Sequence, residues 1–197
     1  MSAAARAIEL DGSNALGYAL RGIGALWGGQ LDRYPDALAD ARRAHEMNPN
    51  DTLVLQFLAF LESGAGEPER AIEHGLQILR LNPRQSRSHM TYTLLASASF
   101  VAKQYAEGVR WALRALNDMP RLIQTQSTLA MCLVGTGEID KARSVFAAGQ
   151  KQAPEFFKIR LEGRASVYAR SEDRTRSLTF LRIAAGLEDP SAADALR

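Results

Sequence analysis

Three histidines and one cysteine are the side chains in this sequence that could bind a metal ion or act as a nucleophile. No two of His45, His74 and His89 have the three- or four-residue spacing that brings two metal ligands to one face of a helix. Cys132 is the only cysteine, which excludes an internal disulfide and a cluster of thiolate ligands. We therefore predict that the chain holds no metal ion and needs no cofactor.

Each of these four residues also has a plain structural interpretation. His45 and His74 stand near the ends of predicted helices, where a surface histidine suits the negative end of the helix dipole. Cys132 lies within "LAMCLV" and has no basic neighbour that would lower the pKa of its thiol, so we predict a buried packing role. His89 begins a predicted helix, and contact between its side chain and a ligand stays open as an alternative there.

Paired carboxylates and a glycine-rich turn complete the residues that could support catalysis. Glu67 with Glu69 stands at one predicted helix start, where a carboxylate offsets the partial positive charge of the backbone. Glu172 with Asp173 stands at another. The turn "GTGEID" joins two predicted helices and lacks the Lys-Ser/Thr ending of a phosphate-binding loop. The sequence therefore predicts a protein that is not an enzyme.

The composition is that of an ordinary globular protein in water. Hydrophobic residues make up 46% of the 197 positions, and the formal net charge of +2 gives too weak a field to favour nucleic acid as a partner. No apolar stretch approaches the roughly 18 residues that a membrane-spanning helix needs, and the first residues show no secretion signal. We expect a cytoplasmic protein or domain that contacts neither a membrane nor nucleic acid.

Two further features leave open the alternative of an acidic protein or RNA as the partner. The basic side chains between Lys158 and Arg182 could attract an acidic partner or RNA, but interspersed acids dilute their field and favour a solvated face. Trp27 and Trp111 belong to different predicted helices. We therefore interpret both tryptophans as packing residues, in preference to a platform on which nucleic-acid bases stack.

The elements that would position these residues follow a repeat. Pro49, Pro83, Pro120 and Pro154 each follow a helix-like segment, and they are 34, 37 and 34 residues apart. A small residue stands twelve positions before each proline: Ala37, Ala71, Gly108 and Ala142. Another stands twelve positions earlier again: Ala25, Ala59, Ala96 and Ala130. Small and apolar residues at helical steps, separated by turn signals, predict two antiparallel helices in each unit.

This pattern resembles the tetratricopeptide repeat, a helix-turn-helix unit of about 34 residues. The resemblance implies an all-α fold, in which antiparallel helix pairs stack into a right-handed superhelical array, or α-solenoid. It covers residues 13–154, in four units: 13–49, 50–83, 84–120 and 121–154. The first and third units are three residues longer than the others, and we place this extra turn before the first helix of each.

Segments outside the four units are assigned from the same pattern. Residues 1–12 are interpreted as the end of a truncated repeat helix, in a fragment of a longer protein, with a frayed natural terminus as the alternative. Residues 155–186 are expected to form a capping pair of helices, and residues 187–197 a loosely held tail or a short terminal helix.

In the tetratricopeptide family the first helix of each unit lines the concave face, which implies a binding groove there. The residues expected to face this groove come from units two to four: Leu53, Gln56, Phe60, His89, Met90, Thr93, Ser97, Phe100, Gln124, Ser127 and Met131. These side chains are nearly neutral, so the resemblance does not extend to the chaperone-binding subset, whose groove Lys, Arg and Asn residues grip a C-terminal carboxylate. The expected ligand is an extended or helical peptide with apolar anchors.

A closer resemblance concerns the whole run of repeats. The "NPND" turn, the segment "FVAKQYAEGVRWALRAL" and the closing "LRIAAGL" are similar to the C-terminal repeat regions of bacterial nucleotide cyclases of the adenylate and guanylate class. The resemblance implies a protein–protein interaction scaffold that serves as the regulatory domain of a larger signalling protein. Two alternatives stay open: a homo-oligomerisation module, for instance a homodimer, and the sensor array of a winged-helix transcriptional regulator.

Overall fold

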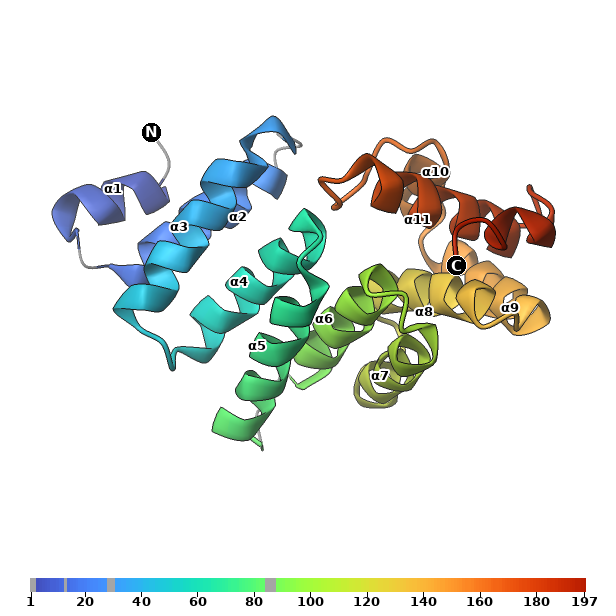
Figure 1. Cartoon of the computed structure of the whole chain (residues 1–197), viewed down its shortest axis with the longest axis horizontal. Helices are drawn as coiled ribbons and strands as arrows, with labels where there is room; N and C mark the ends of the chain where they lie inside the picture. The colour runs from blue at the N-terminus through green and yellow to red at the C-terminus, as the bar shows by residue number, and fades with distance from the viewer. Residues whose placement is uncertain (1–2, 13, 28–30, 84–87) are drawn as a thin grey trace.

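The computed structural model describes residues 3–12, 14–27, 31–83 and 88–197. Over these residues the regular secondary structure is helical, without a strand, which confirms the predicted fold class (Figure 1). The α-helices are α1 (Ala3–Leu10), α2 (Ala15–Trp27), α3 (Tyr34–Met47), α4 (Thr52–Ala65), α5 (Pro68–Leu81), α6 (Ser88–Val101), α7 (Tyr105–Asp118), α8 (Ile123–Gly135), α9 (Ile139–Gln152), α10 (Pro154–Leu161) and α11 (Ser171–Ala184). Two 3-10 helices accompany them: η1 (Leu31–Arg33) and η2 (Pro190–Ala193). Among the helices that the structure describes, none combines the length and apolar character that a membrane span requires.

The helices from α2 to α9 form hairpins, one in each unit of the repeat: α2 with α3, α4 with α5, α6 with α7, and α8 with α9. Successive hairpins lie side by side in a curved row (Figure 1). The first helices of the hairpins pack on one another along the inner side of this row, and the second helices form the outer side. The first helices therefore build the concave face, as the resemblance implies.

Turn residues begin and end the helices of the second unit. Asp51 precedes α4, and its carboxylate accepts hydrogen bonds from the backbone N–H groups of Leu53 (2.8 Å) and Val54 (3.1 Å). Gly66 follows α4 with a φ of 87°, in the left-handed region that favours glycine. Pro68 then starts α5, at a position where no backbone N–H is needed. Local signals therefore mark both ends of this turn.

Small residues let the two helices of a hairpin touch. In the second unit Ala59 packs with Ala71, at the spacing that the repeat predicts. In the first unit Gly22 lies opposite Ala37, because a Cβ atom added to Gly22 would be 2.6 Å from the Ala37 carbonyl oxygen. Ala25, which holds the corresponding position in the repeat pattern, stands almost one helical turn further along α2. Our placement of the extra turn is therefore wrong for the first unit, where it lies between the two helices and includes η1.

The segment after α9 departs from the expected pair of capping helices. After the short α10, residues 163–169, here called the strap, run without helix. Their amphipathic pattern predicted a helix, but long-range hydrogen bonds hold the strap in an extended form. The backbone N–H of Ala169 donates to the carbonyl oxygen of Gly64 in α4 (2.8 Å), and the hydroxyl of Tyr34 in α3 donates to the carbonyl oxygen of Val167 (3.3 Å). The strap thus reaches back from the end of the array to its second unit.

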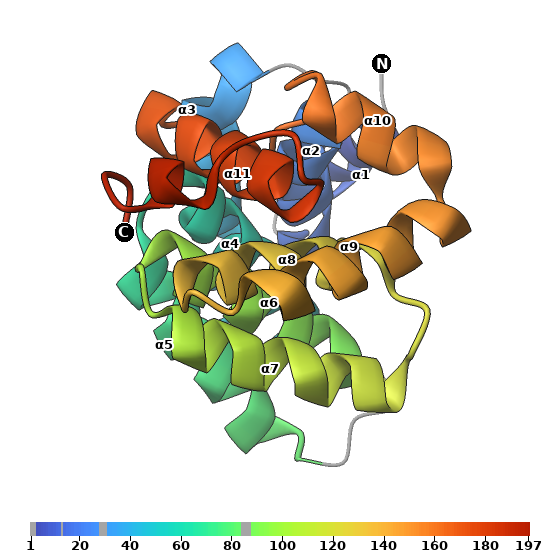
Figure 2. The same cartoon turned by 90° about the vertical axis from the view of Figure 1, so that its right-hand side faces the viewer.

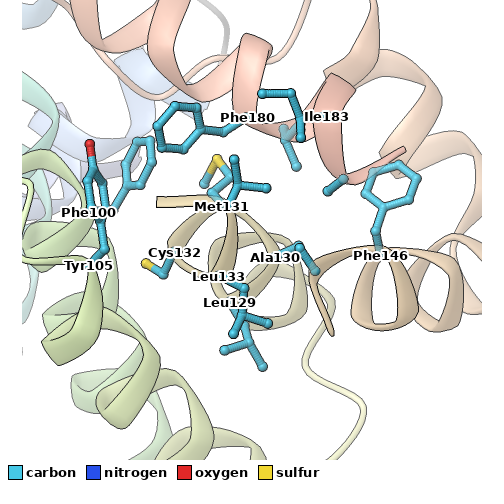
Figure 3. Close-up of a cluster of buried hydrophobic side chains, with 14 of the residues drawn as sticks. Phe100, Tyr105, Leu129, Ala130, Met131, Cys132, Leu133, Phe146, Phe180 and Ile183 are labelled. Atoms are coloured by element: carbon cyan, nitrogen blue, oxygen red, sulfur yellow. The ribbon is translucent and has the colours of Figure 1, made fainter. Parts of the chain in front are cut away.

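Helix α11 covers the first helices of the last two units. It lies across the array beside α8 and α9 (Figure 2). Figure 3 shows Phe180 and Ile183 of α11 directed toward Met131 of α8. Phe180 also packs edge-on against Phe100 of α6, with ring centroids 5.8 Å apart. These side chains belong to one large core cluster that joins the last repeats to the C-terminal segment.

A buried ion-pair network anchors the start of α11. The carboxylate of Asp173, which has no exposed surface, accepts hydrogen bonds from Arg170 (2.7 Å) and from Arg176 (2.5 Å). Arg176, only 5% exposed, also donates to the carbonyl oxygen of Val101 at the end of α6 (3.0 Å). The network therefore fixes α11 to the repeat helices.

The predicted tail, residues 187–197, is packed against the array. Ala193 is buried in the large core cluster. The Lys103 ammonium donates to the carbonyl oxygen of Arg197 (2.8 Å), and the Arg197 guanidinium donates to the carbonyl oxygen of Val134 (3.1 Å). These bonds place the tail over the turns that join α6 to α7 and α8 to α9.

Candidate binding groove

A groove of about 1140 Å³ lies between the first helices and the C-terminal segment. Its floor comes from α2, α4, α6 and α8, and its second wall comes from α10, the strap and α11. The floor includes these residues: Ile23, Gln56, Phe57, Phe60, Met90, Thr93, Leu94, Ser97, Gln124 and Thr128. Small-molecule pockets measure about 300 to 1,000 Å³. This groove has room for several residues of a peptide.

Polar side chains of the floor are bonded to neighbouring repeats. Gln56 of α4 donates to the carbonyl oxygen of Met90 (3.4 Å) and accepts from the hydroxyl of Thr91 (3.1 Å). The hydroxyl oxygens of Thr93 in α6 and Thr125 in α8 are 2.6 Å apart. These bonds tie α4 to α6 and α6 to α8, so the floor is a preformed surface.

Aromatic and aliphatic side chains supply most of the contact area in the groove. Phe57 and Phe60 are one helical turn apart on α4, so they share one face, and both are half-buried. Met90 of α6 is 42% exposed. Phe156 of α10 faces them from the second wall. Apolar side chains of a ligand could therefore be buried from two sides.

The second wall brings positive charge that the floor lacks. Three arginines line it, whereas Asp32, near the start of the array, is the acid among the described lining residues. Arg164 forms an ion pair with Glu162 (2.9 Å). Arg174 donates to the backbone carbonyl oxygens of the strap at positions 168 (3.2 Å) and 169, so it holds the strap in place. The third arginine, Arg160, has no such partner among the residues that the structure describes.

Arg160 projects from α10 beside an aromatic ring. Its guanidinium carbon lies 5.6 Å from the centroid of the Phe156 ring, within the range of a cation–π interaction. Its Nε atom is buried and has no hydrogen-bond partner within the described part of the chain. Burial lowers the pKa of Arg160, because removal from water penalises the charged form, and the nearby Tyr168 hydroxyl opposes this effect in part.

Some of the residues predicted to face the groove do line it. Those that line it are Gln56, Phe60, Met90, Thr93, Ser97 and Gln124. Leu53 and His89 lie near the starts of α4 and α6, outside the lining, and Leu53 is 40% exposed. A contact of any of these side chains with a partner stays a prediction.

Three of the residues predicted to face the groove lie in the core instead. Phe100, Ser127 and Met131 have no exposed surface. The physical reason is α11, which packs on the concave side of α6 and α8 and covers Phe100 and Met131 with Phe180 (Figure 3). The concave face is therefore open over α4 and the start of α6 and closed near the end of α8.

Sequence reasoning missed several residues of the groove. Phe57 could have been found, since it lies one helical turn before Phe60 on the same predicted helix. Phe156 and Arg160 could not, because the expected capping pair placed most basic side chains in water. Their position depends on the packing of α10 against α9 and α11.

The histidines do not line the groove. His45 and His74, from successive second helices, have ring centroids 5.1 Å apart, and the Nδ1 atom of His74 lies 2.7 Å from a carboxylate oxygen of the buried Glu62. Burial, followed by the nearby charge of His74, lowers the pKa of His45. Among the described residues no group of three His, Cys, Asp or Glu side chains could hold a metal ion.

Cysteine and tryptophan have the packing roles that the sequence favours, as far as the structure describes them. Cys132 is buried in the large core cluster, and burial raises the pKa of its thiol. Trp111 stacks on Tyr92 with ring centroids 5.8 Å apart, and the Arg114 guanidinium lies over the Trp111 ring. The side chain of Trp27 lies outside the described residues.

Solved structures of tetratricopeptide repeat proteins have the same fold. PilW, a widely conserved type IV pilus biogenesis factor, superposes with a TM-score of 0.70 at 16% identity, over 98% of this chain and 82% of PilW. A thermophilic TPR protein of Thermus thermophilus gives a TM-score of 0.64 at 18% identity, over 91% of this chain and 87% of that protein. YrrB, a TPR protein with an unusual peptide-binding site, gives 0.56 at 21% identity, over 99% of each chain. At such identities the likeness establishes the fold, a tetratricopeptide-type α-solenoid.

Sequence comparison alone does not identify this fold. Neither a model of a protein family nor a curated protein sequence matches the chain. The pattern of small residues and prolines is therefore the part of the sequence that carries the resemblance.

Proposed function

We propose that this protein is an interaction scaffold that binds a peptide segment of a partner protein in the groove between its first helices and the strap. The observation that carries the proposal is the groove itself, which is preformed and lined by aromatic side chains on its floor and on its second wall. Such a surface buries apolar anchors of a peptide without a large rearrangement. The solenoids of known structure that share the fold include one with a peptide-binding site, which agrees with this role.

A selection from a random library of 12-residue peptides on the full chain tests the proposal. Peptides that bind are measured by fluorescence anisotropy against wild type and two groove variants, Phe60→Ala and Met90→Ala. We expect affinity to fall about tenfold or more for Phe60→Ala, because aromatic anchors dominate such interfaces. The exposed Met90 should contribute less, and its substitution should leave folding unchanged.

Leu113→Ala is the matched control for the groove variants. Leu113 is 53% exposed on α7, at the outer side of the array. Its substitution should leave peptide affinity unchanged. A loss of binding for Leu113→Ala, with full binding by both groove variants, would move the site to the outer surface and contradict the proposal. Circular dichroism melting of each variant separates loss of binding from loss of fold.

Self-association is a second candidate function, favoured by one specific surface. Apolar side chains of α1 and α2 are exposed to solvent, with Leu10 at 72% and Leu20 at 40%. A copy of the chain could cover them by hydrophobic contact. Sedimentation at increasing concentration tests this, because dimers should weaken in a Leu20→Ser variant. A wild-type chain that remains monomeric at every concentration would remove the candidate.

The place of the groove in a larger protein is also part of the proposal. A regulatory role within a bacterial signalling protein, such as a nucleotide cyclase or a winged-helix regulator in the cytoplasm, rests on sequence resemblance alone. In that role, a peptide in the groove would recruit a partner or transmit its presence to an effector domain.

A further inference from the structure

Arg160 is a charged group without a counter-charge in the wall of the groove. No described carboxylate forms an ion pair with it, and its buried Nε atom has no hydrogen-bond acceptor. The ring of Phe156 is the aromatic neighbour that its guanidinium contacts. A partly buried guanidinium loses hydration, and that loss is offset fully only when an acceptor, above all a carboxylate, binds it.

Other arginines of the C-terminal segment do have such partners. Arg164 pairs with Glu162, and Arg182 pairs with Glu188 at 3.2 Å. Arg170 and Arg176 share the carboxylate of Asp173. The segment therefore satisfies these arginines within the chain, whereas Arg160 faces the groove unpaired.

The surroundings of Arg160 limit what could bind it. Phe57, Phe60 and Leu94 lie on the floor of the same groove, and Phe156 lies beside the guanidinium. A free inorganic anion would leave these apolar surfaces uncovered. A peptide that presents a carboxylate next to an aromatic or aliphatic residue would satisfy the charge and cover the apolar surface together.

We propose that the groove selects acidic, apolar peptide segments, and that Arg160 binds the carboxylate of the ligand while the phenylalanines bury its apolar anchor. This inference rests on the proposed function and names the ligand class of the same groove. The carboxylate can come from an Asp or Glu side chain or from the C-terminus of the peptide. In either case its bond to Arg160 is a charge-assisted hydrogen bond inside a partly water-excluded groove.

A panel of labelled 12-residue peptides tests the inference on the full chain. Each peptide carries Phe and Leu four positions apart, and a neighbouring position holds Asp, Asn or Lys. Each is made with a free or an amidated C-terminus. Wild type is compared with Arg160→Gln, with Arg160→Lys, and with the control Arg143→Gln, whose exposed arginine lies on the outer helix α9 and forms none of the ion pairs described.

We expect the Asp peptide, or the peptide with a free C-terminus, to bind wild type about tenfold more tightly than its neutral counterpart, a typical effect of a charge-assisted bond. Arg160→Gln should abolish this preference and leave the neutral peptides unaffected. Arg160→Lys should retain part of it, and Arg143→Gln all of it. The comparison of the two carboxylate sources shows which one the groove uses.

Equal affinity of wild type for the acidic and the neutral peptides would overturn the inference, as would a preference that survives Arg160→Gln. Either result leaves peptide binding itself intact, provided that Phe60→Ala still weakens it. If none of the peptides binds, or if Phe60→Ala has no effect, the proposed function fails and this inference fails with it. Because the neutral substitution is also made in the peptide, the comparison of peptides on wild type does not depend on the folding of a protein variant.

Discussion

The two halves of the array differ in how their cores are closed. In the first half, buried side chains form small separate clusters within the described residues, such as one around Ile23 and Leu58 and one around Ala59 and Leu94. In the second half, one large cluster runs from Phe100 on α6 through α8 to α11 and the tail. The same repeat pattern builds both halves, so the difference comes from α11 and the strap.

This difference teaches what a terminal segment does to a repeat protein. Each repeat buries its apolar face on its neighbours. On the concave side of the last units, α11 takes the place of a neighbour and closes the face. Over α4 the strap is hydrogen-bonded at the helix end, at Gly64, and leaves the aromatic face beside it open. The groove lies where the closed half meets the open half.

The largest expected effect comes from the anchor of α11. Asp173→Ala removes the carboxylate that holds Arg176, which leaves a buried guanidinium without its ion-pair partner. We expect a loss of about 3–5 kcal/mol in the free energy of unfolding, measured in urea. The neighbouring Glu172→Ala is the control, since its side chain is 68% exposed and should contribute at most about 1 kcal/mol. Similar losses for both variants would contradict the view that α11 closes the second half.

A smaller effect is expected where the strap joins the first half. Gly64→Ala would place a Cβ atom 2.5 Å from the Val167 carbonyl oxygen and into the Tyr34 hydroxyl. The strap would have to move, at a cost of about 1–3 kcal/mol. Thermal melting measures this loss.

Gly24→Ala is the matched control, because no described atom outside its own helix turn lies within 4 Å of its added Cβ. In the interior of α2 this change should stabilise the protein by about 0.5–1 kcal/mol, since alanine favours the helix more than glycine does. A Gly64→Ala protein as stable as Gly24→Ala would mean that the strap does not bind the first half.

The smallest expected effect is a loss of stability at acidic pH that depends on His45 in the first half of the array. The pKa of His45 is lowered in the folded protein, so protonation favours the unfolded chain. The stability that neutral His45 contributes is present above the unfolded pKa of about 6.5 and is lost as the pH falls through the lower folded pKa. Melting temperature should therefore fall between pH 7.5 and pH 5 by more in wild type than in His45→Gln.

His89→Gln is the control for the loss of stability at acidic pH. His89 lies on α6, away from His45 on α3, so its substitution should leave the pKa of His45 unchanged. It should reproduce the wild-type dependence on pH. An identical dependence in wild type and His45→Gln would show that the histidine pair does not set the acid sensitivity of the first half.

The hairpins could be predicted because their signals are local. Asp51, Gly66 and Pro68 act through the backbone next to them, and Ala59 meets Ala71 within a single unit. Gly22 shows the limit of this reasoning, since both Gly22 and Ala25 are small and only the packing against Ala37 distinguishes them.

The closed part of the groove could not be predicted because its contacts are distant in the sequence. Val167 accepts a hydrogen bond from Tyr34, and Ala169 pairs with Gly64, across more than half of the chain. Met131 is apolar and lies on a first helix, so nothing local distinguishes a side chain that faces a ligand from one that faces α11.

Hydrogen exchange of the full chain with and without a selected peptide tests the central claim most directly. The claim is that the ligand lies between the first helices and the strap. The account predicts slower exchange in α4, in α6 and in residues 163–169 when the peptide is bound. Slower exchange confined to the second helices α5, α7 and α9, with no change in the strap, would contradict it.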